Sequence, residues 1–252
     1  MITLISSSFF SLPKDSARVN QDSCLLPSSS DNRIIFAIAD GLGGYKGGKE
    51  ASQQVIEFIN EHYKDYSFET FDDLFNDLKT SVMMLSETNK EFVNAASTLT
   101  LCFIKGKKLH IGHIGDCRLY GKINNKLVQF TKDHTQQQAL IDQGVFTKKQ
   151  LEKSVIKNVL TTAISKTLVL DYELIEISLE EIVDEDGYIN LYLMSDGAHS
   201  FWEKRPRFSI NTINEPSRFA SSLLKRIKNG PPIDDHSLIS VKLHYQNIDN
   251  QK

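Results

Sequence analysis

Five aspartates in this sequence stand near the ends of hydrophobic, strand-like runs. Asp40 closes one run, Asp116 and Asp196 follow two others, Asp234 precedes a fourth, and Asp22 stands in the segment RVNQDS. Strand ends can bring together carboxylates that lie far apart in the chain. Several ionised carboxylates in one place repel one another unless a divalent cation neutralises them. Carboxylate, carbonyl and water oxygens are ligands of Mg²⁺ and Mn²⁺, so the sequence predicts a site for these ions.

Glycine follows two of these aspartates, at Gly41 and Gly197. Glycine lets the backbone approach a neighbouring group closely, so the Gly41 carbonyl is itself a candidate metal ligand. The alternative is that Asp-Gly marks an ordinary hairpin turn, which we would prefer for a single occurrence. The ordered set of aspartates favours the metal site.

The elements that must position these residues are strands and amphipathic helices. Residues 33–40, RIIFAIAD, form a nearly continuous hydrophobic run that predicts a buried strand ending at Asp40. Residues 28–32, SSSDN, predict a turn. Hydrophobic positions three and four residues apart predict one helix over residues 48–62 and a second from Phe71, with a stripe that continues to Phe92.

The remaining elements alternate irregularly along the chain. Strands are predicted at residues 2–9, 23–26, 99–103, 108–114, 118–122, 127–130, 172–178, 188–194 and 237–245, and helices at 135–143, after Thr147 and at 217–228. This order lacks the regular strand–helix–strand alternation of a doubly wound parallel sheet. We therefore predict an α+β fold in which two antiparallel sheets pack together with helices outside.

Composition limits the class of protein. The 252 residues contain 29 Lys and Arg against 32 Asp and Glu, and this net charge of −3 argues against a nucleic-acid partner. No hydrophobic run reaches the about 20 residues that span a bilayer, and the first ten residues carry no Lys or Arg of a secretory signal. Three cysteines without CxxC spacing favour neither disulfides nor a zinc site. We expect a single cytoplasmic domain over residues 1–252 with no membrane partner.

Two short segments match the motifs of other enzyme classes. Residues 43–50, GGYKGGKE, differ by one residue from a nucleotide-binding phosphate loop, but Glu50 stands where that loop needs a hydroxyl. Residues 110–113, HIGH, match an aminoacyl-tRNA synthetase signature. They lie in a predicted strand, where His110 and His113 would point to opposite faces. A magnesium–nucleotide enzyme that uses the loop at residues 43–49 stays open as one alternative.

Taken in order, the motifs of this chain resemble those of the PP2C family of metal-dependent protein phosphatases, in its compact bacterial form. Each motif is weak alone, but the ordered set is specific and runs from about residue 15 to residue 243. The matching segments are ARVNQD (17–22), DGLGG (40–44), GKEAS (48–52), ASTLTL (96–101), IGHIGDCRLY (111–120), TKDHT (131–135), NVLTTAI (158–164), MSDGAHS (194–200) and DDHSLISV (234–241).

The resemblance implies an αββα four-layer sandwich that hydrolyses phosphoserine and phosphothreonine esters of proteins through a water bridging two Mg²⁺ or Mn²⁺ ions. By their motif positions, Asp40 would bridge both metals and Gly41 would offer its carbonyl. Asp196 and Asp234 would complete the first metal site. Asp22 would support the second metal, mostly through water.

The resemblance also assigns supporting roles. Asp116 and Asp196 match positions that hold a third, weaker metal in bacterial members, and Asp235 is expected to support the ligands rather than bind metal. Arg18 is the candidate for binding the substrate phosphate, although it stands one residue nearer the motif aspartate than the family's arginine. Leu42 replaces a histidine that some eukaryotic members carry as a proposed general acid, so water is expected to protonate the leaving group.

The expected partners are phosphorylated proteins and a cognate Ser/Thr kinase, and the expected state is a monomer. A second alternative, from another class, is a phosphopeptide-binding module on the same fold with little turnover. Its support is the one-residue offset of Arg18. A Mn²⁺-dependent assay on p-nitrophenyl phosphate distinguishes it from the enzyme.

Overall fold

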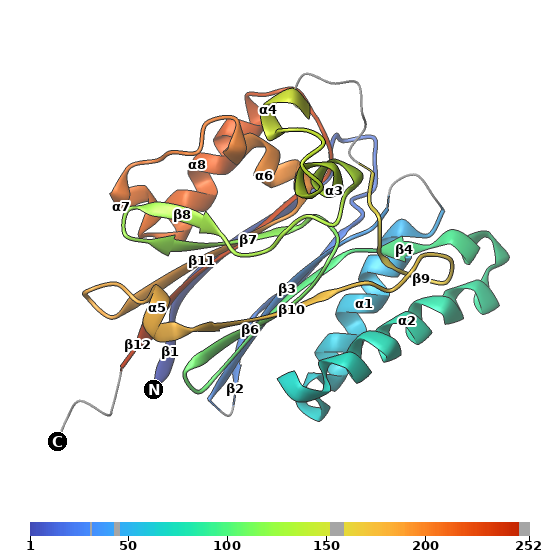
Figure 1. The fold of residues 1–252 in the computed structure, drawn as a ribbon, viewed down its shortest axis with the longest axis horizontal. Coiled ribbons are helices and arrows are strands. Elements are labelled where there is room, and N and C mark those ends of the chain that lie inside the picture. The colour runs from blue at the N-terminus through green and yellow to red at the C-terminus, as the bar shows by residue number, and fades with distance from the viewer. Residues whose placement is uncertain (31, 43–45, 152–158, 247–252) are drawn as a thin grey trace.

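Two five-stranded antiparallel sheets lie face to face in the computed structural model, and helices cover the outer face of each (Figure 1). The structure describes residues 1–30, 32–42, 46–151 and 159–246. This arrangement confirms the predicted αββα sandwich of the α+β class. Among the described residues, no helix is both long enough and hydrophobic enough to cross a membrane.

The first sheet has the strand order β1–β12–β11–β7–β8, and the second has the order β10–β6–β5–β3–β2. The first contains β1 (Ile2–Leu12), β7 (Arg118–Ile123), β8 (Lys126–Gln129), β11 (Tyr188–Met194) and β12 (His236–Tyr245). The second contains β2 (Asp22–Ser30), β3 (Arg33–Asp40), β5 (Leu99–Lys105), β6 (Lys108–Ile114) and β10 (Glu173–Ser178). A separate short pair consists of β4 (Ala96–Ser97) and β9 (Ile164–Ser165).

Two long helices, α1 (Gly48–His62) and α2 (Phe71–Thr88), cover the second sheet. The first sheet is covered by α6 (Asp196–Glu203) and α8 (Pro216–Lys228). Each helix buries one apolar stripe against its sheet, as the sequence spacing predicted for α1 and α2. The shorter elements are α3 (Gln136–Asp142), α4 (Lys148–Leu151), α5 (Leu179–Ile182), α7 (Ile210–Ile213), η1 (Tyr63–Asp65), η2 (Phe68–Thr70) and η3 (Lys90–Asn94).

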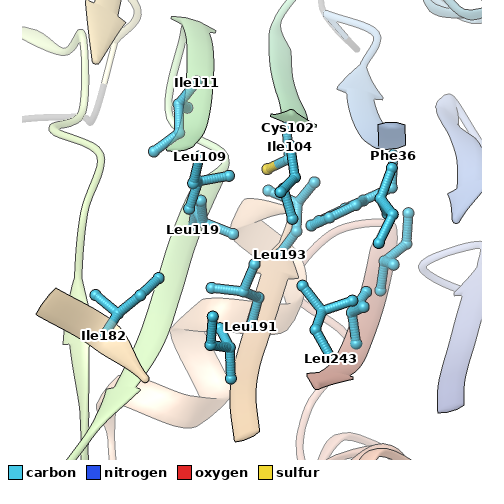
Figure 2. Packing of buried hydrophobic residues seen from close by; sticks show 14 of the residues in the cluster. Phe36, Cys102, Ile104, Leu109, Ile111, Leu119, Ile182, Leu191, Leu193 and Leu243 are labelled. Carbon is cyan, nitrogen blue, oxygen red and sulfur yellow. The ribbon is translucent and has the colours of Figure 1, made fainter. Parts of the chain in front are cut away.

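The alternation of side chains along strand β3 determines where Asp40 lies. Its residues 34, 36 and 38 pack between the two sheets, whereas residues 35, 37 and 39 pack against the helices. Both faces are therefore buried, which accounts for the continuous hydrophobic run. Figure 2 shows Phe36 of β3 in the same cluster as Leu191 and Leu193 of β11. Asp40 continues the inward-facing row, so its carboxylate lies where the space between the sheets opens.

Antiparallel pairing brings the five aspartates to one end of the sandwich, away from the N-terminus (Figure 1). Strands β3, β6 and β11 run toward this end, and they finish at Asp40 or shortly before Asp116 and Asp196. Strands β2 and β12 run away from it, and they begin at Asp22 or shortly after Asp234. Strand direction alone therefore gathers residues from across the chain.

Several element boundaries differ from the sequence prediction. The predicted turn at residues 28–32 is wrong at its start, because β2 continues to Ser30; residue 31 lies outside the described residues. The stripe predicted to reach Phe92 ends with α2 at Thr88. Asn89 is extended there and its side chain caps η3, which contains Phe92. Helix α6 was not predicted, because it is short and has Gly197 in its first turn.

We expect the packing between the sheets to dominate stability. Leu193→Ala removes a fully buried side chain from this core and should lower the free energy of unfolding by about 2–5 kcal/mol. Val128→Ala is the matched control, because Val128 is 41% exposed on β8, and it should change stability by less than about 0.5 kcal/mol. Urea denaturation of the two variants measures the difference. Similar losses in both would contradict this account of the core.

Candidate metal centre and active site

Asp22 and Asp40 lie opposite each other in the antiparallel pair β2–β3. Directly opposed residues of such a pair project from the same face, with Cβ atoms about 5 Å apart. The Asp40 N–H donates to Thr98 Oγ1 at 3.0 Å, and the Asp40 carbonyl accepts from the Thr98 N–H at 2.8 Å. The two carboxylates therefore share the end of the space between the sheets, and the backbone of one is locked in place.

Two serines of the first sheet hold the Asp22 carboxylate. The Oγ atoms of Ser195 and Ser237 donate to Asp22 Oδ2 at 2.8 and 2.7 Å, and Ser195 Oγ also accepts from the Ser237 N–H at 2.9 Å. Both serines continue the inward-facing rows of β11 and β12. These hydrogen bonds tie an aspartate of the second sheet to the first sheet.

Gly41 and Gly197 are required by close packing of backbone. A Cβ atom on Gly41 would lie 2.1 Å from the Gly48 carbonyl oxygen, and one on Gly197 would lie 1.9 Å from the Asp235 carbonyl oxygen. A side chain at either position would push the neighbouring segment away from the preceding aspartate. Another segment of the backbone therefore lies close to each glycine, and the Gly41 carbonyl as a metal ligand stays a prediction.

Asp22, Asp40, Asp116 and Asp196 have raised pKa values, and burial is the largest cause for each of these four. Burial raises the pKa of Asp22 to about 6 despite the two serine hydrogen bonds. Burial also raises the pKa of Asp40 and Asp196 well above the usual range, and the other carboxylates add to it. Asp40 feels the charges of Asp22, Asp196, Asp116 and Asp234, so all five aspartates lie within electrostatic reach of one another.

Asp116 lies beside the buried ion pair of Arg118 and Asp133. Arg118 Nε and Nη2 donate to the two Asp133 oxygens at 2.7 and 2.6 Å. Burial and the Asp133 charge raise the pKa of Asp116 to about 7, although Arg118 opposes this. Burial would also raise the pKa of Asp133, but Arg118 outweighs it and the pKa is lowered. Arg118 therefore neutralises the charge of Asp133, and it offsets only part of the rise in the pKa of Asp116.

Two buried histidines near the site are neutral. His199 Nε2 lies 3.1 Å from the Asp116 carbonyl oxygen, and His113 Nε2 lies 2.9 Å from the Lys132 carbonyl oxygen. Burial is the largest cause of the shift, and the pKa of each imidazole is lowered to about 3. Neither can donate a proton as an imidazolium at neutral pH. His110 stacks on Phe68 under the helices, so the HIGH histidines do face opposite ways, as predicted.

Asp234 is the exposed member of the set, and its neighbour Asp235 is buried. Asp235 Oδ1 accepts from the Lys14 N–H and Oδ2 accepts from the Gln21 N–H, each at 2.7 Å. Its carboxylate thus closes the two ends of the loop over residues 14–21, which joins β1 to β2. The expected role of Asp235 beside the metal ligands stays a prediction.

Arg18 lies in the middle of that loop, and its side chain is 66% exposed. Its Nε is 3.9 Å from Asp15 Oδ2, a distance at which an exposed pair contributes little stability. The guanidinium is therefore available to a ligand, and the loop that carries it is anchored beside Asp234 by Asp235.

The donor set fits Mg²⁺ or Mn²⁺. Asp22 Oδ1 and Asp196 Oδ1 are buried and have no hydrogen-bond partner among the described residues. Such atoms are rare in proteins, and a divalent cation would supply the missing partner while removing the repulsion. Within the described part of the chain, no three or more His, Cys, Asp or Glu side chains are grouped so that they could hold a metal ion by themselves.

Sequence reasoning missed three residues that build this site, namely Thr98, Ser195 and Ser237. The sequence could have indicated the two serines by their positions, because Ser195 directly precedes Asp196 and Ser237 closely follows Asp234. Gly43 and Gly44 of the DGLGG segment, residues 43–45 of the phosphate-loop-like segment, and residue 158 of NVLTTAI lie outside the described residues.

Comparison with known proteins gives a consistent assignment. The family model described as "Protein phosphatase 2C" matches residues 14–229. A Mycoplasma genitalium protein that carries the name of a protein phosphatase is 30% identical over 202 residues, which are 73% of this chain and 75% of that protein. The serine/threonine phosphatase stp of Listeria monocytogenes is 25% identical over 153 residues, 58% of this chain and 61% of that protein.

Solved structures show the same fold at lower identity. Serine/threonine phosphatase Stp1 from Staphylococcus aureus has a TM-score of 0.82 and 18% identity, and the match covers 97% of this chain and 96% of that one. The catalytic domain of the phosphatase PstP, solved with two manganese ions, has a TM-score of 0.74 and 21% identity, with 97% and 100% covered. At these identities the likeness concerns the fold alone.

The electrostatics predict that removing one carboxylate stabilises the metal-free protein. The folded-state pKa of Asp116 is raised from 3.8 to about 7, so its ionisation opposes folding. This penalty is absent below pH 4, grows between pH 4 and 7, and is complete above pH 7. Asp116→Asn in EDTA should therefore raise the free energy of unfolding by about 1–4 kcal/mol at pH 8, and by much less at pH 4.

Urea denaturation at the two pH values checks this result. Asp186→Asn is the matched control, because Asp186 is exposed in the connection before β11. A metal-free Asp116→Asn protein that is less stable than the wild type at pH 8 would contradict the predicted repulsion.

Proposed function

Since this chain belongs to the protein phosphatase 2C family, we propose that its five-aspartate site hydrolyses phosphoserine and phosphothreonine esters of proteins with bound Mn²⁺ or Mg²⁺. The observation that carries the proposal is the convergence of five carboxylates, two with unpartnered buried oxygens, at one end of the sandwich. Such a set suits two ions, or three with Asp116. When bound, the ions would neutralise phosphate oxygens and lower the pKa of the attacking water.

The roles of the metal-binding residues follow from their surroundings. Asp40 is proposed to bridge two ions, because the charges of all four other aspartates reach it. The Gly41 carbonyl, Asp196 and Asp234 would complete the first site. Asp22 has one oxygen held by two serines and one oxygen that has no partner among the described residues, which suits a support for the second ion through water.

The proton for the leaving group is proposed to come from water. His113 and His199 are neutral near the site, and their pKa values are too low for an imidazolium donor at neutral pH. Leu42 stands where some eukaryotic family members carry a histidine. The described residues around the aspartates therefore offer orientation and charge, and proton transfer is left to solvent.

We propose one phosphatase domain over residues 1–252, because both sheets contribute to a shared core. A cytoplasmic location is supported by three cysteines that are free thiols. The proposed partners are phosphoproteins together with a cognate Ser/Thr kinase, and the proposed state is a monomer.

Metal dependence tests this function. The protein should hydrolyse p-nitrophenyl phosphate and a phosphothreonine peptide with added Mn²⁺, and EDTA should abolish both activities, because the carboxylates need a cation to hold phosphate. Asp234→Asn should keep the fold but retain less than a tenth of the wild-type kcat, a loss of at least ~1.4 kcal/mol in the barrier. Asp196→Asn should behave in the same way.

The control variant for this assay is Asp186→Asn, which changes an exposed aspartate outside the site. Full turnover by metal-stripped protein would overturn the metal-dependent mechanism. Metal-dependent phosphopeptide binding without turnover would instead favour the binding module, and nucleotide binding without ester hydrolysis would favour the nucleotide enzyme.

Arg18 is proposed to grip the substrate phosphate, because an exposed guanidinium on an anchored loop can bind two oxygens in a fork. Arg18→Ala should raise KM for a phosphopeptide by about tenfold and lower kcat less, since the contact already exists in the ground state. Arg18→Lys should restore only part of the affinity. Steady-state kinetics at fixed Mn²⁺ measure both variants, and unchanged KM in both would show that Arg18 does not bind phosphate.

A further inference from the structure

A groove of about 470 Å³ lies directly beside the aspartate site. Phe201 and Ile227 are buried in its floor, whereas Leu12 and Ile233 are partly exposed along its walls. Asp234 lines the same groove, so one edge of it belongs to the proposed metal centre. The walls come from the end of β1, the connection after α8 and helix α6, which are separate in the sequence.

The charges around this groove are mixed, because two lysines and two aspartates line it. Lys14 and Lys228 line it, and Lys228 is exposed at the end of α8. Asp15 also lines it, and its exposed carboxylate lies 3.9 Å from Arg18, a distance at which the two charges interact weakly. Asp234 is the remaining acid, and its charge would be offset by the cation. An apolar groove with two lysines at its rim suits an apolar group next to an acidic one.

One wall of the groove is held in place by the site itself. Residues 13–16 of this wall belong to the β1–β2 connection, and Asp235 accepts from the Lys14 N–H there at 2.7 Å. The same carboxylate accepts from the Gln21 N–H next to Asp22. The groove and the aspartates therefore adjoin each other, with Asp234 and Asp235 at their junction.

We propose that this groove is a substrate subsite, which binds a large apolar side chain of the phosphoprotein close to its phosphorylated residue, with an acidic neighbour held by Lys14 and Lys228. The proposal rests on the proposed function. A substrate whose phosphate reaches the aspartates must lay its next residues on the adjoining surface, since an extended chain advances about 3.5 Å per residue. Asp234 belongs to both the proposed metal centre and the groove, so a substrate residue near the phosphate reaches the groove.

Substrate variation tests the subsite without changing the protein. Four phosphothreonine peptides would carry Leu or Ser at the positions flanking the phosphothreonine, each with and without added Asp. Without Asp, the Leu peptide should have a kcat/KM at least about tenfold above that of the Ser peptide, which is the discrimination a single apolar pocket achieves. Added Asp should raise kcat/KM further. The increase in kcat/KM that Asp causes should become smaller as salt is added, because salt screens the charges of the lysines.

Two variants locate the preference. Leu12→Ser removes an apolar wall and should reduce the Leu-over-Ser ratio to about threefold or less. Lys228→Gln should remove most of the preference for Asp while keeping that for Leu. Val128→Ser is the control, because Val128 is a similarly exposed aliphatic residue on β8, away from the groove, and it should leave both ratios unchanged. Ratios within one variant are independent of how much protein is folded.

The outcomes separate this subsite from the proposed function. If the wild type shows no preference, or if Leu12→Ser keeps the wild-type ratios while p-nitrophenyl phosphate and phosphopeptides are hydrolysed, the subsite is overturned and the phosphatase stands. If no phosphopeptide and no p-nitrophenyl phosphate is hydrolysed with Mn²⁺, the proposed function falls and the subsite falls with it.

Discussion

Repulsion among buried carboxylates is the constraint on which this structure depends. Asp40 feels four other aspartates, and burial raises the pKa of Asp22, Asp40, Asp116 and Asp196. The nearby cation, Arg118, is engaged by Asp133 in a two-pronged ion pair. Ionisation of these carboxylates is therefore unfavourable unless a divalent cation neutralises them, and the rest of the sandwich keeps the carboxylates together.

The sandwich performs this task through strand direction and side-chain alternation. Ser195 and Ser237 continue the inward rows of β11 and β12, and they bond Asp22 of the other sheet. Asp40 continues the inward row of β3. The large apolar core between the sheets thus fixes the separation of polar residues that lie at its open end. In this fold, hydrophobic residues that take no part in the reaction set the geometry of the site.

The segment 234–235 connects the metal centre to the surface that a substrate would meet. Asp234 is exposed toward the groove, and Asp235 holds the loop that carries Arg18. The backbone of this segment packs against Gly197, next to Asp196. Three proposed functions, namely metal binding, phosphate binding and recognition of flanking residues, therefore meet at two adjacent aspartates.

The sequence by itself determined the fold class and the positions of most strands and long helices. It also identified the aspartates as candidate metal ligands. These features depend on local periodicity and on residue chemistry, which are visible in a chain without coordinates. It did not reveal helix α6, the end of α2 at Thr88, or the serines that hold Asp22, because these depend on capping and on contacts between residues more than 170 positions apart. Only the tertiary structure decided which carboxylates share a charge environment and which surface adjoins them. Burial and pairing across two sheets are properties of the packed chain, and they leave no local pattern in its sequence.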